Sequence, residues 1–371
     1  MESSVMKTTR LFNFSAGPGT LPLSVLQVAQ QHLVSLPGVG MSIMELSHRS
    51  SAFEEILGTA EANLRDLMKL PEHYRILFLH GGATLQFSMI PISFLRGTGS
   101  VAEYVVSGTW GQKALNEARR EGDARVSWTG EKEGFTRAPL SSEINIGADA
   151  AYAHLTSNET IQGIQLQDQP LPGTTPMFCD MSSDFLSRAI DIERYALFYA
   201  GAQKNAGPAG VTVVVIREDL LERASTDIHT LLDYRVHVAH DSMYNTPPVF
   251  AIYVVMLVTQ WLRDKIGGLE NMGTINEQKS KMLYDVIDQS NGFYRGHARP
   301  DSRSRMNVTW HISDDTLATI FARQAQEREL VNLNGHRSMG GFRASIYNAM
   351  PIQGVRALRD LMLDFQTQYS G

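Results

Sequence analysis

The feature that most constrains the fold of this chain is a regular alternation of short apolar runs with longer amphipathic stretches. The runs are rich in β-branched and aromatic residues, as buried strands are. They are Tyr74–Leu79, Val101–Val106, Ala124–Trp128, Ala151–Leu155, Met177–Asp180, Leu197–Ala200 and Val211–Ile216. Helical spacing follows in between, over Ser50–Lys69, Leu85–Leu95 and Gly111–Glu121. Because parallel strands need such crossovers, the pattern predicts an α/β fold with a mostly parallel, mixed sheet covered by helices.

A smaller unit is predicted at the C-terminal end, since 371 residues are more than one hydrophobic core usually organises. Val249–Lys265 is apolar nearly all round and is followed by Gly267 and Gly268, which predicts a buried helix ending at a domain boundary. Helical patterns (Asn276–Ser290, Thr316–Gln326, Val355–Thr367) and strand-like runs (Met306–Ile312, Arg343–Tyr347) follow. We therefore expect an N-terminal segment (1–20), a large domain (21–266) and a small α+β domain (267–371), with the loop-like Phe12–Pro22 joining either lobe.

Composition excludes several classes of function. A formal net charge of −6 argues against a general binder of nucleic acid or of anionic membranes. The first residues lack the apolar stretch of a signal peptide, and the longest apolar run, Val249–Val258, is too short to span a bilayer. The single cysteine, Cys179, excludes an internal disulfide and a cysteine-based metal cluster. We expect a cytoplasmic protein without a metal.

A lysine and an aspartate at two predicted strand ends are the first candidates for chemistry. Lys204 lies in Tyr199–Gly210, among small residues that leave room for a bulky planar ligand. Asp180 ends another apolar run. The pair suits pyridoxal phosphate, because a lysine can form a Schiff base with its aldehyde while a carboxylate keeps the pyridine nitrogen protonated. A solvated lysine and a structural Lys–Asp ion pair remain the alternatives on these residues alone.

Further motifs carry a resemblance that covers nearly the whole chain. In order they are Asn13–Pro18, Ser47–Arg49, His80–Gly82, Trp110-Gly111, Asn158–Ile161, the Gly201–Gly210 stretch around Lys204, Asn245–Pro248, Gly335–Arg337 and Gly340–Met350. Each motif is weak alone, but their order together resembles the phosphoserine aminotransferase family, in the class V group of fold-type I pyridoxal-phosphate enzymes. The resemblance implies a pyridoxal 5′-phosphate enzyme that works by ping-pong kinetics.

The resemblance also implies roles for particular residues. Lys204 would be the Schiff-base lysine and the general base and acid, and Asp180 the partner of the pyridinium nitrogen. Trp110 would stack on the ring, Thr160 would hydrogen-bond its phenolic oxygen, and Gln203 would add a ring or phosphate contact. The backbone N–H groups of Ala83 and Thr84 would bind the phosphate at a helix N-terminus. Asn245 and Thr246 would reach the phosphate of the neighbouring subunit in a homodimer with shared active sites.

The substrates that the resemblance implies are L-glutamate and 3-phosphooxypyruvate, both anionic at both ends. Arg343 would hold the α-carboxylate as a bidentate fork. The γ-carboxylate or phosphate would be bound by two His-Arg pairs: His48, Arg49, His336 and Arg337. One departure concerns Ala83-Thr84, where some family members carry Gly-Arg, so a hydroxyl stands in place of a cationic contact. The resemblance leaves open whether the related phosphorylated keto acid of vitamin B6 synthesis is also a substrate.

Two other interpretations of the same residues remain. Another class V enzyme would be an alanine–glyoxylate-type aminotransferase, which has no need of the two His-Arg pairs, or a cysteine desulfurase. The desulfurase is disfavoured because Cys179 lies beside Asp180 at a strand end rather than on a loop. A nucleotide-binding α/β module without catalysis is the second rival. No GxGxxG or GxxxxGK[ST] loop follows any predicted strand, which argues against it.

Overall fold

The computed structural model describes residues 10–167 and 173–370. Its centre is a seven-stranded sheet with the strand order β2-β10-β9-β8-β5-β3-β4. In that order the strands are β2 (Tyr74–Leu79), β10 (Thr212–Arg217), β9 (Leu197–Gly201), β8 (Met177–Asp180), β5 (Ala150–Thr156), β3 (Val101–Val106) and β4 (Asp123–Thr129). Only β10 runs antiparallel to its neighbours, β2 and β9. The predicted mostly parallel, mixed sheet is confirmed, and each strand lies within one residue of its predicted bounds.

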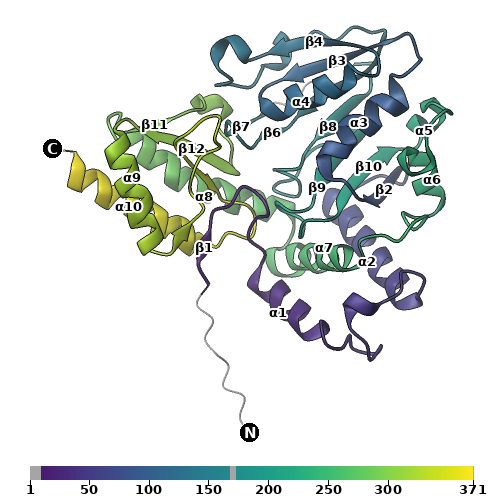
Figure 1. Ribbon diagram of the computed structural model, residues 1–371, viewed down its shortest axis with the longest axis horizontal. Coiled ribbons are helices and arrows are strands. Elements are labelled where there is room, and N and C mark those ends of the chain that lie inside the picture. The colour runs from purple at the N-terminus through teal and green to yellow at the C-terminus, as the bar shows by residue number, and fades with distance from the viewer. Residues whose placement is uncertain (1–9, 168–172, 371) are drawn as a thin grey trace.

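Helices cover both faces of this sheet, and Figure 1 shows the resulting layers. One face packs against α3 (Gly82–Phe94), α4 (Thr109–Ala118), α5 (Asp219–Arg223) and α6 (Tyr234–Ala239). The other packs against α1 (Leu23–His32), α2 (Ser51–Met68) and α7 (Val249–Trp261). Alternate residues of β2 point to opposite faces of the sheet. Leu77 and Leu79 pack in the core on the α3 side, and Ile76 and Phe78 pack in the core on the α7 side.

Several helix ends differ from the predicted ones. α3 begins at Gly82, one turn before Leu85, because Gly81 adopts a left-handed conformation with φ of 88° and starts the helix early. α7 passes into a π-helical turn over Leu262–Ile266, and Gly267 then ends it in a left-handed conformation. α1 is an element that the sequence patterns did not predict.

The C-terminal part has its own hydrophobic core around a three-stranded antiparallel sheet in the order β11-β12-β14. Its elements are α8 (Leu269–Gln289), β11 (Tyr294–Gly296), β12 (Asn307–Ile312), α9 (Asp315–Glu327), β13 (Leu330–Val331), β14 (Phe342–Ser345) and α10 (Ile352–Tyr369). This core is separate from the two that flank the large sheet. We propose on this ground that the small domain begins at Gly267, as the sequence predicts.

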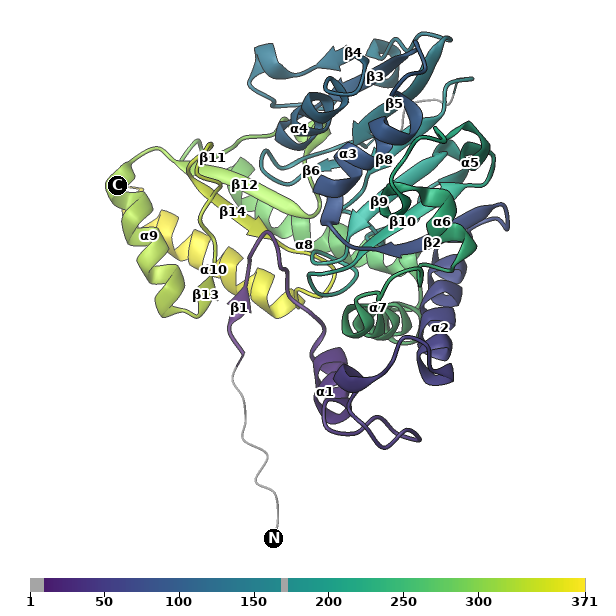
Figure 2. The same ribbon diagram turned by 45° about the vertical axis from the view of Figure 1, so that its right-hand side comes forward.

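The N-terminal segment belongs to both parts. β1 (Phe12–Asn13) pairs in parallel with β13 of the small sheet region, and the chain then crosses to α1 beneath the large sheet, a path that Figures 1 and 2 both show. Tyr347, in the loop that follows β14, donates its hydroxyl hydrogen to the carbonyl of Ala16 at 2.7 Å. This hydrogen bond fixes the crossing segment against that loop. This crossing carries residues 16 and 17 over the strand ends of the large sheet.

Several short elements connect the main strands and helices. β6 (Asn158–Glu159) and β7 (Ile164–Gln165) form a two-stranded antiparallel pair just after β5. Single 3₁₀ turns occur at Ile43–Glu45, Glu131–Glu133, Ser141–Glu143, Ile192–Arg194, Thr230–Leu232 and Pro300–Ser302. Within the described residues, none of the helices is both long and apolar enough to cross a bilayer.

Candidate active site

The carboxyl ends of β2, β3, β5, β8 and β9 all meet at one edge of the large sheet, because these strands run in the same direction. Asp180 is the last residue of β8, and Lys204 follows the end of β9. Both line one cavity of about 410 Å³, a size within the range of roughly 300–1,000 Å³ that is usual for small-molecule sites. The strand ends therefore bring the two candidates together, as the fold class predicts.

The cavity has walls from the N-terminal segment, from the strand ends and from the small sheet. It is lined by Ala16, Gly17, Gly81, Gly82, Ala83, Thr84, Trp110, Thr156, Asn158, Thr160, Ile161, Asp180, Ser182, Ser183, Gln203, Lys204, His336 and Arg343. Most of the cofactor-binding residues that the sequence predicts are among them.

Lys204 is partly buried in the cavity wall rather than solvated on the surface. Its Nζ donates a hydrogen bond to Thr160 Oγ1 at 2.6 Å and lies 5.6 Å from the centroid of the Trp110 ring. Burial lowers the pKa of Lys204 to about 8, while the charges of Asp180 and Glu159 act in the opposite direction. A lysine in this state presents much more neutral amine near neutral pH than a solvated one does, as a nucleophile or general base requires.

Asp180 is a buried carboxylate with a backbone partner. Its side chain accepts the N–H of Ser182 at 2.9 Å, and the residue is 4% exposed. Burial raises the pKa of Asp180, and the hydrogen bonds from Ser182 oppose this rise. In the part of the chain that the structure describes, Lys204 bonds to Thr160 and forms no salt bridge with Asp180. A structural Lys–Asp ion pair therefore does not explain why the two residues lie in one cavity.

The first turns of two helices frame the cavity. α3 starts immediately after β2, so Ala83 and Thr84 lie in its first turn, where backbone N–H groups have no acceptor within the helix. α4 follows β3 and brings the Trp110 ring to the cavity wall. The Gln203 side chain packs close to Gly201, where an added Cβ would lie 2.6 Å from Gln203 Oε1.

Candidate substrate-binding residues fall into two groups. Arg343, on β14, lines the cavity, donates to the carbonyl of Thr160 at 3.3 Å and is half-buried, and His336 lines the cavity as well. Burial lowers the pKa of His336, and the nearby charges of Arg343, Arg337 and Lys113 lower it further. Arg337 is exposed next to His336 and is not part of the lining.

The other predicted residues lie elsewhere on this chain. His48 and Arg49 sit in the turn before α2 and are not part of the cavity lining. Asn245 and Thr246 line a different cavity of about 420 Å³. The capping alternative for these two is not what the structure has, because Pro248 is the N-cap of α7 and no side chain caps that helix.

Thr156, Asn158 and Glu159 lie at the site without a role assigned from the sequence, although the last two belong to the Asn158–Ile161 motif. Thr156 is the last residue of β5 and pairs directly with Asp180 on β8, so the strand-end rule that found Asp180 applies to it as well. Asn158 lines the same cavity. Glu159 is fully buried beneath Trp110 and accepts hydrogen bonds from the backbone of α4. Nothing in the sequence signals this last contact, which joins segments far apart in the chain.

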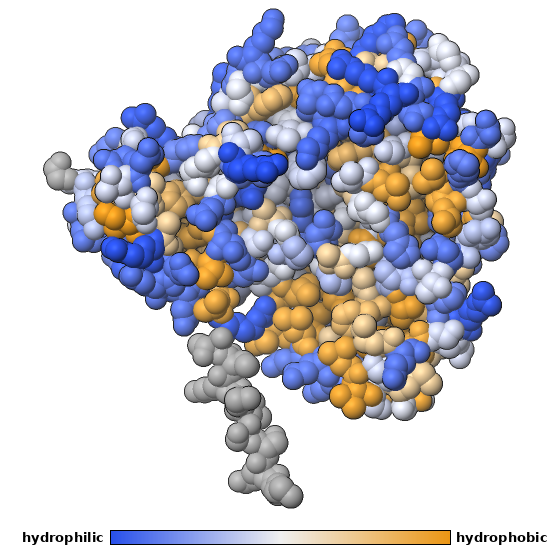
Figure 3. All heavy atoms as spheres, in the orientation of Figure 1, coloured by the Kyte–Doolittle hydropathy of each residue, from blue (hydrophilic) through white to orange (hydrophobic). Residues whose placement is uncertain are grey.

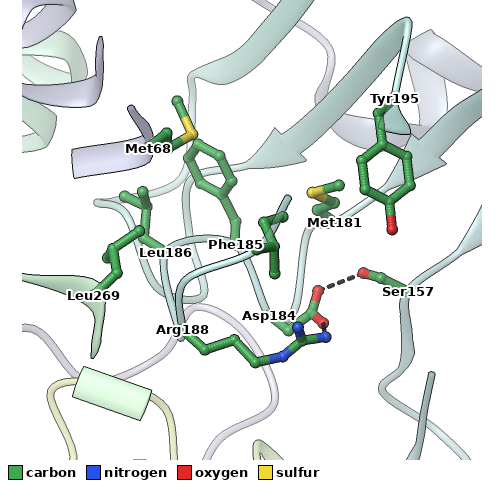
Figure 4. A pocket seen from close by; sticks show the side chains of 10 residues that line it. Met68, Ser157, Met181, Asp184, Phe185, Leu186, Arg188, Tyr195 and Leu269 are labelled. Carbon is green, nitrogen blue, oxygen red and sulfur yellow. Dashed lines mark hydrogen bonds and ion pairs between the residues drawn. The ribbon is translucent and has the colours of Figure 1, made fainter. Parts of the chain in front are cut away.

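A further buried carboxylate, Asp184, has its own hydrogen-bond and charge partners away from the cavity (Figure 4). It accepts hydrogen bonds from the Ser157 hydroxyl and, at 2.9 Å, from Gln165 Nε2, and Arg188 Nη2 lies 3.7 Å away. The space that these residues line measures about 20 Å³, enough for about one water molecule. Asp184 therefore serves the packing below the site and leaves Asp180 as the carboxylate that lines the larger cavity.

No set of three or more His, Cys, Asp or Glu side chains within residues 10–167 and 173–370 is grouped to hold a metal ion. The cavity lining itself offers an amine, a carboxylate, an aromatic ring and cationic side chains.

Comparisons with known proteins agree with this geometry. Residues 11–358 match the family model described as aminotransferase class-V. The chain is 50% identical over 370 residues to a phosphoserine aminotransferase of Rhodopirellula baltica, covering 100% of this chain and 98% of the relative. The solved phosphoserine aminotransferase from Bacillus circulans subsp. alkalophilus is 46% identical with a TM-score of 0.94, covering 97% of this chain and 99% of that one.

A second solved structure is that of a PLP-bound phosphoserine aminotransferase from Trichomonas vaginalis. It is 39% identical with a TM-score of 0.88, and the match covers 95% of this chain and 100% of that one. Both structures share the fold over nearly their whole length with the chain described above. The chain belongs to the class-V aminotransferase family.

Proposed function

We propose that this protein is a phosphoserine aminotransferase that depends on pyridoxal phosphate. It transfers the amino group of L-glutamate to 3-phosphooxypyruvate and gives O-phospho-L-serine and 2-oxoglutarate, a step of serine biosynthesis. The observation that carries the proposal is that Lys204, Asp180 and Arg343 line one cavity. The chain is also 50% identical to such an enzyme over its full length.

The residues present fit this cofactor. Among the described residues, Trp110 Nε1, Thr156 Oγ1 and Asn158 Oδ1 are buried without a hydrogen-bond partner, and all three residues line the cavity. Buried polar atoms are rarely left unpaired, so this wall of the cavity suits a polar planar group. Asp180 would pair with the pyridine nitrogen, Trp110 would stack on the ring and Thr160 would bond its phenolic oxygen. The first turn of α3 and Gln203 would hold the phosphate.

When bound, pyridoxal phosphate supplies an aldehyde that bonds to amines and a ring that withdraws electrons from the substrate Cα. Lys204 would hold the cofactor through its Nζ, and the amine freed by substrate would act as the base that takes the proton from the substrate Cα and as the acid that gives it back. Its lowered pKa favours the neutral amine that this step needs. Arg343 orients the substrate by binding the substrate's α-carboxylate. The Arg343 guanidinium is held beside the cofactor site by its hydrogen bond to the carbonyl of Thr160.

The second anionic group of each substrate needs further cations. His336 lies at the cavity, and Arg337 is the next residue along the chain. His48 and Arg49 are not in the lining on this chain, so we propose that a second copy of the chain brings them to the site. The active protein is then a homodimer with shared active sites, in which Asn245 and Thr246 also reach the partner's cofactor phosphate.

The surface supports such a dimer. Figure 3 shows apolar side chains gathered over α7 and α1 on the face in view. Large apolar residues are unusually exposed in the segment that precedes His48, with Val34 82% and Met44 63% exposed. Exposed apolar patches of this kind mark protein interfaces. We further propose a cytoplasmic location, which suits a chain whose single cysteine, Cys179, is buried and free.

A coupled assay tests the proposed reaction. The purified protein, loaded with pyridoxal phosphate, is given glutamate as donor with 3-phosphooxypyruvate, pyruvate or glyoxylate as acceptor. We expect kcat/KM for 3-phosphooxypyruvate to exceed that for the other two at least a hundredfold. A preference for glyoxylate or pyruvate would assign the chain to another activity of the same family.

A further inference from the structure

A buried carboxylate outside the predicted set holds the start of the helix that carries Trp110. Glu159, on β6, is 0% exposed. Its Oε2 accepts the backbone N–H of Trp110 at 2.9 Å, and its Oε1 accepts that of Gly111 at 2.8 Å. These N–H groups belong to the first turn of α4 and have no acceptor within the helix. A carboxylate that accepts with both oxygens satisfies two of them at once and complements the helix dipole.

The backbone before α4 approaches Glu159 so closely that it requires a glycine. Gly108 is extended, with φ of −179°, a conformation open to any residue. A Cβ at this position would nevertheless lie 2.6 Å from Glu159 Cδ and 2.7 Å from Gln162 Oε1. The requirement for glycine at 108 therefore comes from contact with these side chains and not from backbone strain.

Gln162 strengthens the same attachment. Its Nε2 donates to Thr109 Oγ1 at 2.7 Å, so residues 159 and 162 hold consecutive residues of the helix start. Glu159 and Gln162 are both buried. The segment after β5 thus fixes α4 through two side chains, and the Trp110 ring inherits its position from them.

The residue next to Glu159 contacts the other side of the site. Thr160 accepts the hydrogen bond from Lys204 Nζ at 2.6 Å, and that nitrogen lies 5.6 Å from the Trp110 ring centroid. Two neighbouring residues of one short segment therefore set the relative positions of the aromatic ring and the reactive amine. A cofactor that Trp110 and Lys204 hold together would depend on these relative positions.

We infer that Glu159 is a positioning residue for the cofactor, which holds the Trp110 ring in place for stacking through the backbone of α4. The inference rests on the proposed function, because it needs Trp110 to stack on pyridoxal phosphate. Burial raises the pKa of Glu159 to about 7, and the two backbone hydrogen bonds oppose this rise. The geometry supports the ionised form, since both oxygens act as acceptors.

The test compares Glu159→Gln, Glu159→Ala and Gly108→Ala with the unchanged protein. Glu103→Gln is the matched control, because Glu103 lies on β3 away from the cavity and accepts from Ser127 Oγ. Two quantities are measured: the dissociation constant of pyridoxal phosphate from the cofactor-free protein, and the visible circular dichroism of the bound cofactor, which reports how its ring lies against the protein. Thermal unfolding of each cofactor-free variant is measured in parallel.

We expect Glu159→Ala to weaken cofactor binding at least tenfold and to change the circular dichroism band. Glu159→Gln should fall between it and the unchanged protein, because the amide keeps one acceptor oxygen. Gly108→Ala should act in the same direction by displacing the carboxylate. When Gly108→Ala is combined with Glu159→Ala, it should weaken cofactor binding by less than a further twofold, because most of the clash with the Glu159 side chain is then gone. Glu103→Gln should leave both quantities unchanged.

A purely structural role for Glu159 would lower only the unfolding temperature. If the dissociation constant stays within twofold and the dichroism band is unchanged in Glu159→Gln and Gly108→Ala, the inference is overturned. These two milder variants decide the matter if Glu159→Ala does not fold. Failure of the unchanged protein to bind pyridoxal phosphate would instead overturn the proposed function.

Discussion

Lys204 Nζ donates a hydrogen bond to Thr160 Oγ1 at 2.6 Å, so the amine that we propose to be reactive is held by a hydroxyl rather than by the neighbouring carboxylate. The arrangement leaves Asp180 available for a ring nitrogen. Lys204 is half-buried, and its Nζ lies 5.6 Å from the centroid of the Trp110 ring.

Lys204→Ala should abolish turnover without unfolding the protein, because the side chain is needed for covalent and proton-transfer steps rather than for packing. Pyridoxal phosphate should still bind, but without a bond that borohydride can fix. Activity and borohydride-stable cofactor content are measured on the same preparation. More than a few per cent of the original activity, or a retained reducible linkage, would show that another residue holds the cofactor.

Thr160→Val keeps the shape of the side chain and removes the hydroxyl that Lys204 bonds to. A neutral hydrogen bond is worth about 1 kcal/mol net, so we expect kcat/KM to fall about fivefold. Thr175→Val is a suitable control, because Thr175 donates to the Gly147 carbonyl outside the cavity. Equal effects of the two substitutions would mean that the Thr160 hydroxyl has no special role at Lys204.

Arg343 and Arg337 should differ in selectivity. Arg343 lines the cavity and would bind the α-carboxylate common to both substrates, so Arg343→Ala should reduce kcat/KM for glutamate and for 3-phosphooxypyruvate alike. Arg337→Ala should reduce efficiency with 3-phosphooxypyruvate at least roughly tenfold, since charge-assisted bonds are worth about 1.5–3 kcal/mol and a phosphate carries more charge than a carboxylate. Unchanged efficiency with 3-phosphooxypyruvate would remove Arg337 from the phosphate pocket.

The capture of cofactor should depend on pH through Lys204. Because burial lowers its pKa to about 8, the rate at which cofactor-free protein bonds to pyridoxal phosphate should rise with pH and level off above about pH 8. Between about pH 8 and the ordinary lysine pKa, the unfolded chain binds the extra proton, so this group makes the cofactor-free protein more stable as pH rises. Lys204→Met should flatten this part of the dependence of unfolding free energy on pH, and an identical slope in both proteins would exclude Lys204 as its source.

The sequence predicts the features that depend on neighbouring residues, and it does not predict those that depend on contacts between distant segments. The runs Tyr74–Leu79, Val101–Val106 and Met177–Asp180 were predicted to the residue, because buried strands carry their pattern locally. The direction of β10 was not visible, since a run of valines is the same in parallel and antiparallel pairing. α1 was missed because it is short and only two of its residues are buried.

The site shows the same limit. Lys204 and Asp180 were found because Asp180 ends one strand, Lys204 follows another, and the strand ends share one edge. Glu159 could not be found, because its importance lies in a contact with the helix start at Trp110, which no local pattern encodes. The separation of His48 from the cavity on this chain is likewise a tertiary fact.

The last prediction concerns the loop before α7, which we propose to enter the active site of a partner subunit. Asn245 and Thr246 precede Pro247 and Pro248, which restrict the loop's path. Asn245 Nδ2 bonds only weakly, at 3.4 Å, to the carbonyl of Thr246, and the Thr246 side chain is exposed. Since neither caps α7, both polar groups are free to meet a ligand of another chain.

Two inactive variants should therefore restore activity when they are combined. Lys204→Ala removes the amine, and Asn245→Ala/Thr246→Ala removes the contacts that the loop makes across the interface, so each variant alone should be nearly inactive. In a mixed dimer, one site has an intact Lys204 from one chain and an intact loop from the other. Mixing under conditions that exchange subunits should then recover up to about half the activity per mixed dimer, whereas Lys204→Ala mixed with Lys204→Met should recover none. If purified mixed dimers are inactive, or if Asn245→Ala/Thr246→Ala alone is a fully active monomer, the loop does not contribute to a shared site.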